Sequence, residues 1–189
     1  MWPNTKDWVF DIIGIDPGSK CTGYSIYTIN SNTLDIIKVN AFTVEAYKSN
    51  YYSKEYSNTY NDKYSRFNAM NREFMDILEY YRPAMVFIES PFFNSFTPNA
   101  FSVLTELLQL YKLTLIDYNN RIPFITVDPP TAKKSIGAKG NAKKDDMTLA
   151  LDRIKDSINL LPDINLLDEH SIDACAIGYW GYINYIKRT

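Results

Sequence analysis

Short apolar runs alternate with amphipathic stretches along the chain, and together they predict a mixed α/β order. Residues 9–16 (VFDIIGID) form a mostly apolar run rich in β-branched side chains, and Pro17-Gly18 ends it. Such a run is typical of a buried strand. Residues 22–30 and 33–44 alternate apolar and polar positions on either side of a Ser-Asn turn. We therefore expect three successive antiparallel strands at the start of the fold.

Four later stretches carry apolar residues at helical spacing, and two short strands are predicted between them. The first helical stretch closes before Pro83, and residues 84–89 (AMVFIE) then predict a strand that ends on an acid. Residues 122–128 predict another strand, stopped by Pro129-Pro130. Residues 45–62 are rich in Tyr, Ser and Asn without clear periodicity, so we expect a surface loop there. The residues that mark the four helices are Phe67, Met70, Phe74, Ile77, Leu78 and Tyr81; Phe101, Leu104, Leu108, Tyr111 and Leu115; Met147, Leu151, Ile154 and Ile158; and Ile172, Cys175, Ala176, Tyr179, Ile183 and Ile186.

The resulting order, βββ-α-β-α-β-α-α, predicts a five-stranded mixed sheet flanked by helices. Three antiparallel strands come first, and two parallel strands join through helical crossovers. A length of 189 residues suits a single domain spanning 1–189. With 46% apolar and 22% charged residues, the composition is that of a globular protein with a sizeable core.

Composition also bears on where the protein works. No apolar run approaches the roughly 18 residues that cross a bilayer, and the first residues lack the layout of a signal peptide. Cys21 and Cys175 are isolated and fit neither a CxxC metal motif nor a disulfide framework. We expect a protein of a reducing compartment, the cytoplasm, an organelle matrix or an infected host cell, with no membrane association and no secretion. High Tyr, Asn, Ile and Lys usage is typical of an AT-rich genome such as that of a phage or organelle.

The charge distribution is uneven. A formal net charge of −2 argues mildly against nucleic-acid binding, because proteins that neutralise phosphates usually carry a basic footprint. Five lysines nevertheless lie between positions 133 and 144 with no acid among them. A solvated loop and a DNA-backbone contact are both compatible with such a run. These lysines are Lys133, Lys134, Lys139, Lys143 and Lys144.

Three acids and the only histidine stand where metal ligands would be expected. Asp16 and Glu89 end predicted strands, and ligands bind at the carboxyl ends of strands in α/β sheets. Asp173 follows His170 by three residues, which places both on one helical face. Crowded carboxylates repel one another unless cations neutralise them, and hard oxygen ligands suit Mg²⁺ or Mn²⁺.

Each of these residues also has a structural interpretation. Asp16 before Pro-Gly suits a turn, and Asp173 suits the first turns of a helix, where the helix dipole favours an acid. His170 suits a cap or a surface position. Glu89 is harder to explain structurally, because a carboxylate at the end of an apolar strand is costly to bury unless it is paired or metal-bound.

Four ordered motifs resemble the RuvC-type Holliday junction resolvases of the retroviral-integrase/RNase H superfamily. Residues 13–20 (IGIDPGSK) with 22–24 (TGY) look like the family's opening motif, and Glu89 followed by Phe92 and Phe93 is similar to the second. Residues 133–144 look like the segment whose lysines contact DNA. Lys133 and Lys143 are the expected counterparts, and a one-residue length difference leaves Lys134 as the alternative to Lys133. Residues 170–176 (HSIDACA) are similar to the closing helix, with histidine where the family carries an acid or a histidine.

The resemblance implies an RNase H-like fold and a structure-selective DNA endonuclease. By this resemblance Asp16, Glu89, His170 and Asp173 would hold two Mg²⁺ ions, which Mn²⁺ can replace, and Lys143 would assist at the scissile phosphate. Phe92 and Phe93 would stack on junction bases, although core packing is an alternative for both. The substrate would be a four-way DNA junction, cut by a homodimer to leave 5′-phosphate and 3′-hydroxyl ends.

Other functions stay open at this stage. A less selective flap or branch endonuclease, or an RNA-processing nuclease, would share the fold. A protein of a different class, an actin-like nucleotide-binding protein, also begins with a strand, an Asp and a Gly turn. That group needs two such folds and further glycine loops, whereas this chain has seven glycines in total. A junction-binding protein without catalysis is the third alternative, and the predicted metal ligands argue against it.

Overall fold

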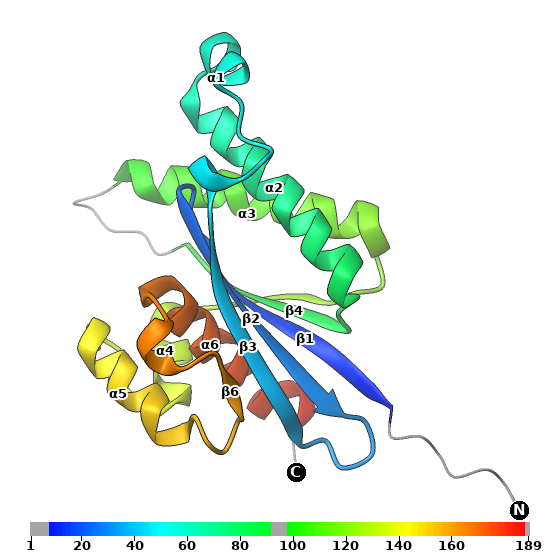
Figure 1. Ribbon diagram of the computed structural model, residues 1–189, viewed down its shortest axis with the longest axis vertical. Helices are drawn as coiled ribbons and strands as arrows, with labels where there is room; N and C mark the ends of the chain where they lie inside the picture. Colours follow the sequence, from blue (N-terminus) through cyan, green and yellow to red (C-terminus); the bar gives the residue numbers. More distant parts are fainter. Residues whose placement is uncertain (1–7, 92–97, 188–189) are drawn as a thin grey trace, which may run out of the picture.

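The computed structural model describes residues 8–91 and 98–187, which fold around one mixed sheet (Figure 1). The strands lie in the order β5-β4-β1-β2-β3-β6. β1 pairs antiparallel with β2 and β2 with β3, whereas β4 is parallel to β1, β5 to β4 and β6 to β3. The strands are β1 (Val9–Asp16), β2 (Cys21–Asn30), β3 (Ile36–Glu45), β4 (Met85–Glu89), β5 (Phe124–Val127) and β6 (Leu160–Leu161).

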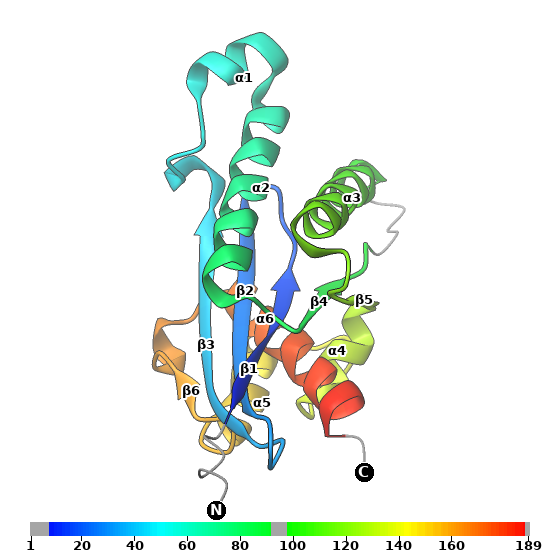
Figure 2. The same ribbon diagram turned by 90° about the vertical axis from the view of Figure 1, so that its right-hand side faces the viewer.

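Helices cover both faces of this sheet (Figure 2). Each face has its own apolar core. α2 and α3 pack on one face, and α4, α5 and α6 on the other. The α-helices are α1 (Lys54–Tyr60), α2 (Asp62–Tyr81), α3 (Pro98–Asn119), α4 (Pro129–Ser135), α5 (Lys144–Ile154) and α6 (Glu169–Gly181). Short helical turns are η1 (Ala46–Lys48), η2 (Ile164–Leu166) and η3 (Tyr182–Ile186).

Burial on both faces explains why β1 is apolar along most of its length. Ile13 and Ile15 point into the core beneath α2 and α3, whereas Ile12 belongs to the core beneath α6. Side chains alternate between faces along a strand, so Asp16 points to the same side as Ile12, the side of α6. Glu89 follows the same rule, because Phe87, two residues earlier on β4, also lies in the α6 core.

The prediction of five strands was wrong by one. β6 has two residues and pairs with Val39 and Asn40 of β3, which makes six strands within the described part of the chain. A two-residue strand carries no period that sequence analysis can detect. The antiparallel start, the parallel additions and the helices that flank the sheet agree with the prediction.

Two segments for which no helix was predicted contain helices. The 45–62 stretch holds η1 and α1, and α1 buries none of its residues, which explains why no apolar stripe marks it. β5 ends at Val127, just before Pro129-Pro130 as predicted, and these prolines also begin α4. Asp128 caps this helix by accepting from the Thr131 amide at 3.0 Å, and proline is well tolerated in a first helical turn. The Asp-Pro pair was therefore a helix start signal.

No helix among the described residues is long and apolar enough to span a membrane.

Candidate active site

Two carboxylates meet at the carboxyl ends of neighbouring parallel strands. β1 and β4 are in register with Ile15 opposite Ile88, so Asp16 and Glu89 are the next residues along each strand. Both side chains point to the α6 face. Asp16 is 15% exposed and Glu89 is partly buried. The central strands of the sheet thus bring together two acids that are 73 positions apart in the sequence.

The beginning of α6 is fixed against the sheet above these acids. Asp168 caps the helix by accepting from the Ser171 amide at 2.9 Å, and it also accepts from the Thr43 hydroxyl of β3 at 2.6 Å. Gly23 of β2 allows the close approach, because a Cβ on this residue would lie 2.0 Å from the His170 carbonyl oxygen. The helix therefore enters at a position that only a glycine on β2 permits.

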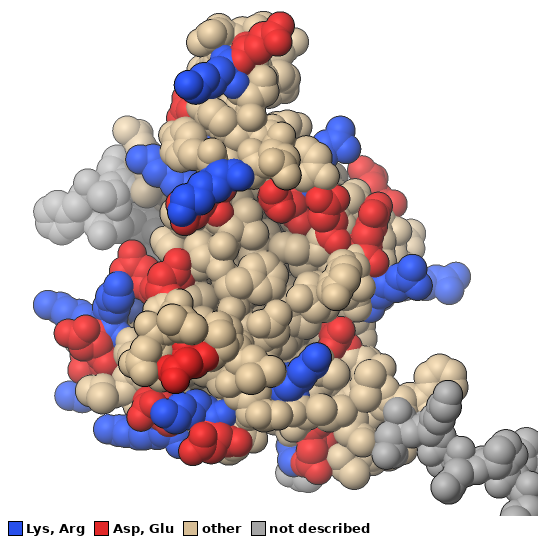
Figure 3. Space-filling view, in the orientation of Figure 1, with Lys and Arg blue, Asp and Glu red and all other residues tan. Residues whose placement is uncertain are grey.

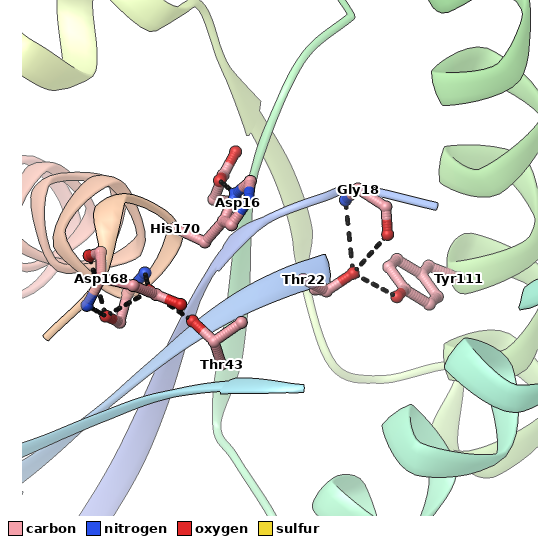
Figure 4. A network of polar contacts seen from close by, with 8 residues as sticks. Asp16, Gly18, Thr22, Thr43, Tyr111, Asp168 and His170 are labelled. Atoms are coloured by element: carbon pink, nitrogen blue, oxygen red, sulfur yellow. Dashed lines mark hydrogen bonds and ion pairs between the residues drawn. The ribbon is translucent and has the colours of Figure 1, made fainter. Parts of the chain in front are cut away.

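α6 in turn supplies a direct partner for Asp16. Nδ1 of His170 lies 2.8 Å from Oδ2 of Asp16 (Figure 4). An ionised carboxylate only accepts, so Nδ1 carries the proton and Nε2 is left to accept or to bind a cation. The bond to Asp16 raises the pKa of His170 above its ordinary value, although burial opposes this. Histidine ligands of metals commonly donate their second ring N–H to a carboxylate in this way.

Two partly buried acids next to this pair have pKa values above their ordinary range. Burial, followed by repulsion from Asp16 and Asp173, raises the pKa of Glu89 to about 8. Burial and repulsion from Asp16 raise the pKa of Asp173 to about 6. Lys133 opposes both effects. A divalent cation would relieve the same repulsion, so the chemistry of this donor set suits a hard metal ion.

The side chains of the predicted metal ligands do not converge on one point in this structure. Within residues 8–91 and 98–187, no three His, Cys, Asp or Glu side chains are placed so that they could hold a metal ion as they stand. The influence of the Asp16 charge on the pKa values of Glu89 and Asp173 is compatible with this. Ligation requires oxygens at roughly 2.0 to 2.6 Å from one ion, whereas buried charges repel over several ångströms. Asp16, Glu89, His170 and Asp173 are therefore neighbours, and binding a cation would require their side chains to turn inward.

The predicted lysines divide into two groups. Lys133 of α4, Lys143 and Lys144 line a cavity of about 270 Å³ together with Asp16, His170 and Asp173. Lys133 also donates from Nζ to the Ala142 carbonyl oxygen at 3.1 Å, which ties α4 to the start of α5. Sequence analysis had no signal for this tie.

The remaining predicted contacts lie elsewhere or outside the described residues. Lys134 is exposed and does not line this cavity, and Lys139 lines a different hollow with Asp146 and Arg153. Phe92 and Phe93 lie outside the described residues. Glu169, which the motif comparison did not single out, also lines the cavity.

On the face shown in Figure 3, acidic and basic side chains are interspersed, and no continuous basic surface is visible there. Lys133, Lys143 and Lys144, in contrast, line the same cavity as the carboxylates.

Comparison with known proteins decides the family. The family model described as crossover junction endodeoxyribonuclease RuvC matches residues 12–178, nearly the whole chain. The chain belongs to this family. Family membership identifies it as an endodeoxyribonuclease that acts at Holliday junctions and depends on a divalent metal.

Individual relatives agree with the assignment. The crossover junction endodeoxyribonuclease RuvC of Ehrlichia chaffeensis is 28% identical over 143 residues, which cover 76% of this chain and 81% of the relative. The protein of the same name from Brachyspira hyodysenteriae is 26% identical, covering 87% of this chain and 89% of its own. The structure of Thermus thermophilus RuvC in complex with a Holliday junction substrate aligns with a TM-score of 0.64 at 16% identity and covers 92% of both chains. This likeness shows that the RuvC family's RNase H-like fold is present here.

Proposed function

We propose that this chain resolves four-way DNA junctions with a metal site built from Asp16, Glu89, Asp173 and His170. The observation that carries the proposal is that Asp16, His170 and Asp173 line one cavity together with lysines, while Glu89 ends β4 beside Asp16. The raised pKa values of Glu89 and Asp173 support it, because the metal-free protein carries a repulsion that divalent cations would remove.

Two Mg²⁺ ions, replaceable by Mn²⁺, would supply an attacking water and neutralise charge on the departing oxygen. Asp16, Glu89 and Asp173 would hold them by their carboxylates, and His170 by Nε2 while Nδ1 stays bonded to Asp16. Hydrolysis without a covalent protein intermediate leaves a 5′-phosphate and a 3′-hydroxyl, ends that a ligase can rejoin.

The lysines at the cavity would bind the DNA backbone. We assign the contact nearest the scissile phosphate to Lys133 together with Lys143, because both line the cavity, whereas Lys134 does not. Lys144 would add sequence-independent, salt-sensitive affinity. Phe92 and Phe93 stay candidates for stacking on unpaired junction bases.

A four-way junction presents two symmetric strands to cut, so we also propose a two-fold homodimer. The groove between α2 and α3 supports this. It includes Tyr64 and Leu113, which are 45% and 59% exposed. Light scattering at several protein concentrations tests the dimer.

The experiment that tests the function compares Mg²⁺-dependent cutting of four-way junctions, three-way junctions, flaps, duplex DNA and R-loops, with Asp16→Asn as the blank. We expect paired nicks in the four-way junction that a ligase reseals. Equal cutting of flaps would favour a general branch nuclease, and equally efficient cutting by Asp16→Asn would overturn the metal site.

A further inference from the structure

The turn that follows Asp16 is held from the side of α3 by a hydroxyl network. Thr22 donates from Oγ1 to the Gly18 carbonyl oxygen at 2.8 Å, and this Oγ1 lies 3.2 Å from the Tyr111 hydroxyl of α3 (Figure 4). Thr22 and Tyr111 are both fully buried. This network fixes the first half of the turn, between Asp16 and the start of β2.

The second half of the turn is held by an arginine of α2. Arg66 donates from Nη1 to the Ser19 carbonyl oxygen at 3.2 Å and to the Ser19 hydroxyl oxygen at 2.7 Å. Its side chain is only 12% exposed. A backbone bond from the Ala46 amide to the Lys20 carbonyl oxygen, at 2.8 Å, holds the turn one residue further on. Ser19 thus lies three residues after Asp16 with two hydrogen bonds to one guanidinium.

Arg66 is itself held by the tyrosine-rich segment that sequence analysis left without a role. Its Nε donates to Asp62 Oδ2 at 2.8 Å. Asp62 also accepts from the hydroxyls of Tyr47, at 2.9 Å, and Tyr52, at 2.8 Å. These hydrogen bonds, that from Tyr52 foremost, lower the pKa of Asp62. The carboxylate therefore stays ionised and compensates the charge of Arg66.

We propose that Arg66 is a positioning residue for the metal site, which orients Asp16 through the Ser19 turn and is oriented in turn by Asp62, Tyr47 and Tyr52. The inference rests on the proposed function, since it requires Asp16 to bind metal. It gives residues 45–62 a role in metal binding. Two donors reach Ser19 and Asp62 at once only from a planar guanidinium, so lysine cannot replace it fully.

The effect appears in metal affinity. Partners one step beyond the ligands typically change metal affinity by roughly 10- to 100-fold when they are removed. Arg66 acts through the backbone of a turn, so we expect the lower end, about tenfold weaker Mn²⁺ binding for Arg66→Gln. The Mg²⁺ concentration for half-maximal cutting should rise by a similar factor, and kcat at saturating Mg²⁺ should stay within about twofold.

The test is Mn²⁺ calorimetry on wild type, Arg66→Gln, Arg66→Lys and Ser19→Ala, with Mg²⁺ titrations of junction cutting alongside. Arg72→Gln is the matched control, an exposed arginine on the same helix without an ion pair to the described residues. We expect Arg66→Lys and Ser19→Ala to lie between wild type and Arg66→Gln, and Arg72→Gln to match wild type. These two milder variants carry the test if Arg66→Gln does not fold.

The outcomes separate this inference from the function on which it rests. No saturable Mn²⁺ binding by the wild type would remove the metal site and with it both proposals. Saturable wild-type binding that is unchanged in folded Arg66 and Ser19 variants would overturn the role of Arg66 alone. A loss of kcat that saturating Mg²⁺ does not restore would also overturn it, because the arginine would then serve the fold or the chemistry and not metal binding.

Discussion

Nδ1 of His170 on α6 is hydrogen-bonded to Oδ2 of Asp16 at the end of β1, 2.8 Å away and across 154 positions of sequence. The bond joins the first and the last motif of the chain. It also means that a cation and a second imidazole proton compete at this pair, because Nε2 binds a metal only when it is unprotonated.

This competition predicts a pH dependence. Asp16 raises the pKa of His170, so protonation opposes metal binding as pH falls. We expect His170→Asp to keep cutting junctions at lower pH than wild type, since a carboxylate loses its proton more readily. The measurement is kcat/KM against pH for both proteins at fixed Mg²⁺. Superimposable profiles would mean that histidine is not a ligand.

Lys133 and Lys134 are adjacent in sequence, but only Lys133 lines the cavity. Lys133 lines the cavity and lowers the pKa of Glu89 and Asp173, whereas Lys134 is exposed outside it. Removing a charge-stabilising donor typically costs about 100- to 1,000-fold in rate. We expect Lys133→Ala to lose about 100-fold in single-turnover cutting and Lys134→Ala to lose at most a few-fold, through salt-sensitive affinity. Equal losses would show that the lysines act only by general attraction.

The raised pKa values of Glu89 and Asp173 predict how the metal-free protein responds to pH. The pKa values of Glu89 and Asp173 are raised to about 8 and about 6, so the folded state holds these protons more tightly than the unfolded state. This contribution to stability is present below about pH 4, and it is lost as pH rises through 6 and then 8. We expect the Tm in EDTA to fall between pH 5 and pH 9.

Glu89→Gln is the control for this pH effect, because it removes the group with the larger pKa shift and leaves the side-chain size nearly unchanged. Its Tm should fall less with pH and exceed that of wild type at pH 9. One pKa unit corresponds to about 1.4 kcal/mol, and each kcal/mol shifts Tm by roughly 2 to 4 °C at this chain length. Mg²⁺ should stabilise wild type more at pH 9 than at pH 5, and equal stabilisation at both would contradict the assignment.

A substitution at Gly23 should damage the active site, although Gly23 is not itself one of the predicted site residues. A Cβ at this position would lie 2.0 Å from the His170 carbonyl oxygen, so Gly23→Ala must push α6 away from β2. We expect a loss of about 1 to 3 kcal/mol in the free energy of unfolding, the usual cost of overpacking. Cutting should fall by up to about 100-fold, because His170 and Asp173 move with the helix.

Gly137→Asn serves as the control for Gly23. Gly137 has a φ of +82° and no atom within 4 Å of an added Cβ, and asparagine tolerates left-handed backbone. A folded Gly23→Ala protein with unchanged Tm and activity would show that the helix accommodates the methyl group without moving.

The sequence by itself determined the order of most strands and helices and the four motifs, because each element and each motif depends on residues close together in the chain. The apolar run of residues 9–16 predicts β1, and the acids at positions 16 and 89 end strands as expected. The sequence did not predict β6, α1 or α4, because β6 has two residues, α1 buries no side chain and α4 buries only Ala132.

Only the tertiary structure decided what depends on distant segments. Strand register places Asp16 beside Glu89, and Gly23 lets α6 bring His170 to Asp16. Which lysine enters the cavity follows from the face that α4 turns inward, and neighbouring lysines look alike in sequence. The pairing of Arg66 with Ser19 was equally inaccessible, because periodicity reports which side of a helix is buried but not which turn of the chain it meets.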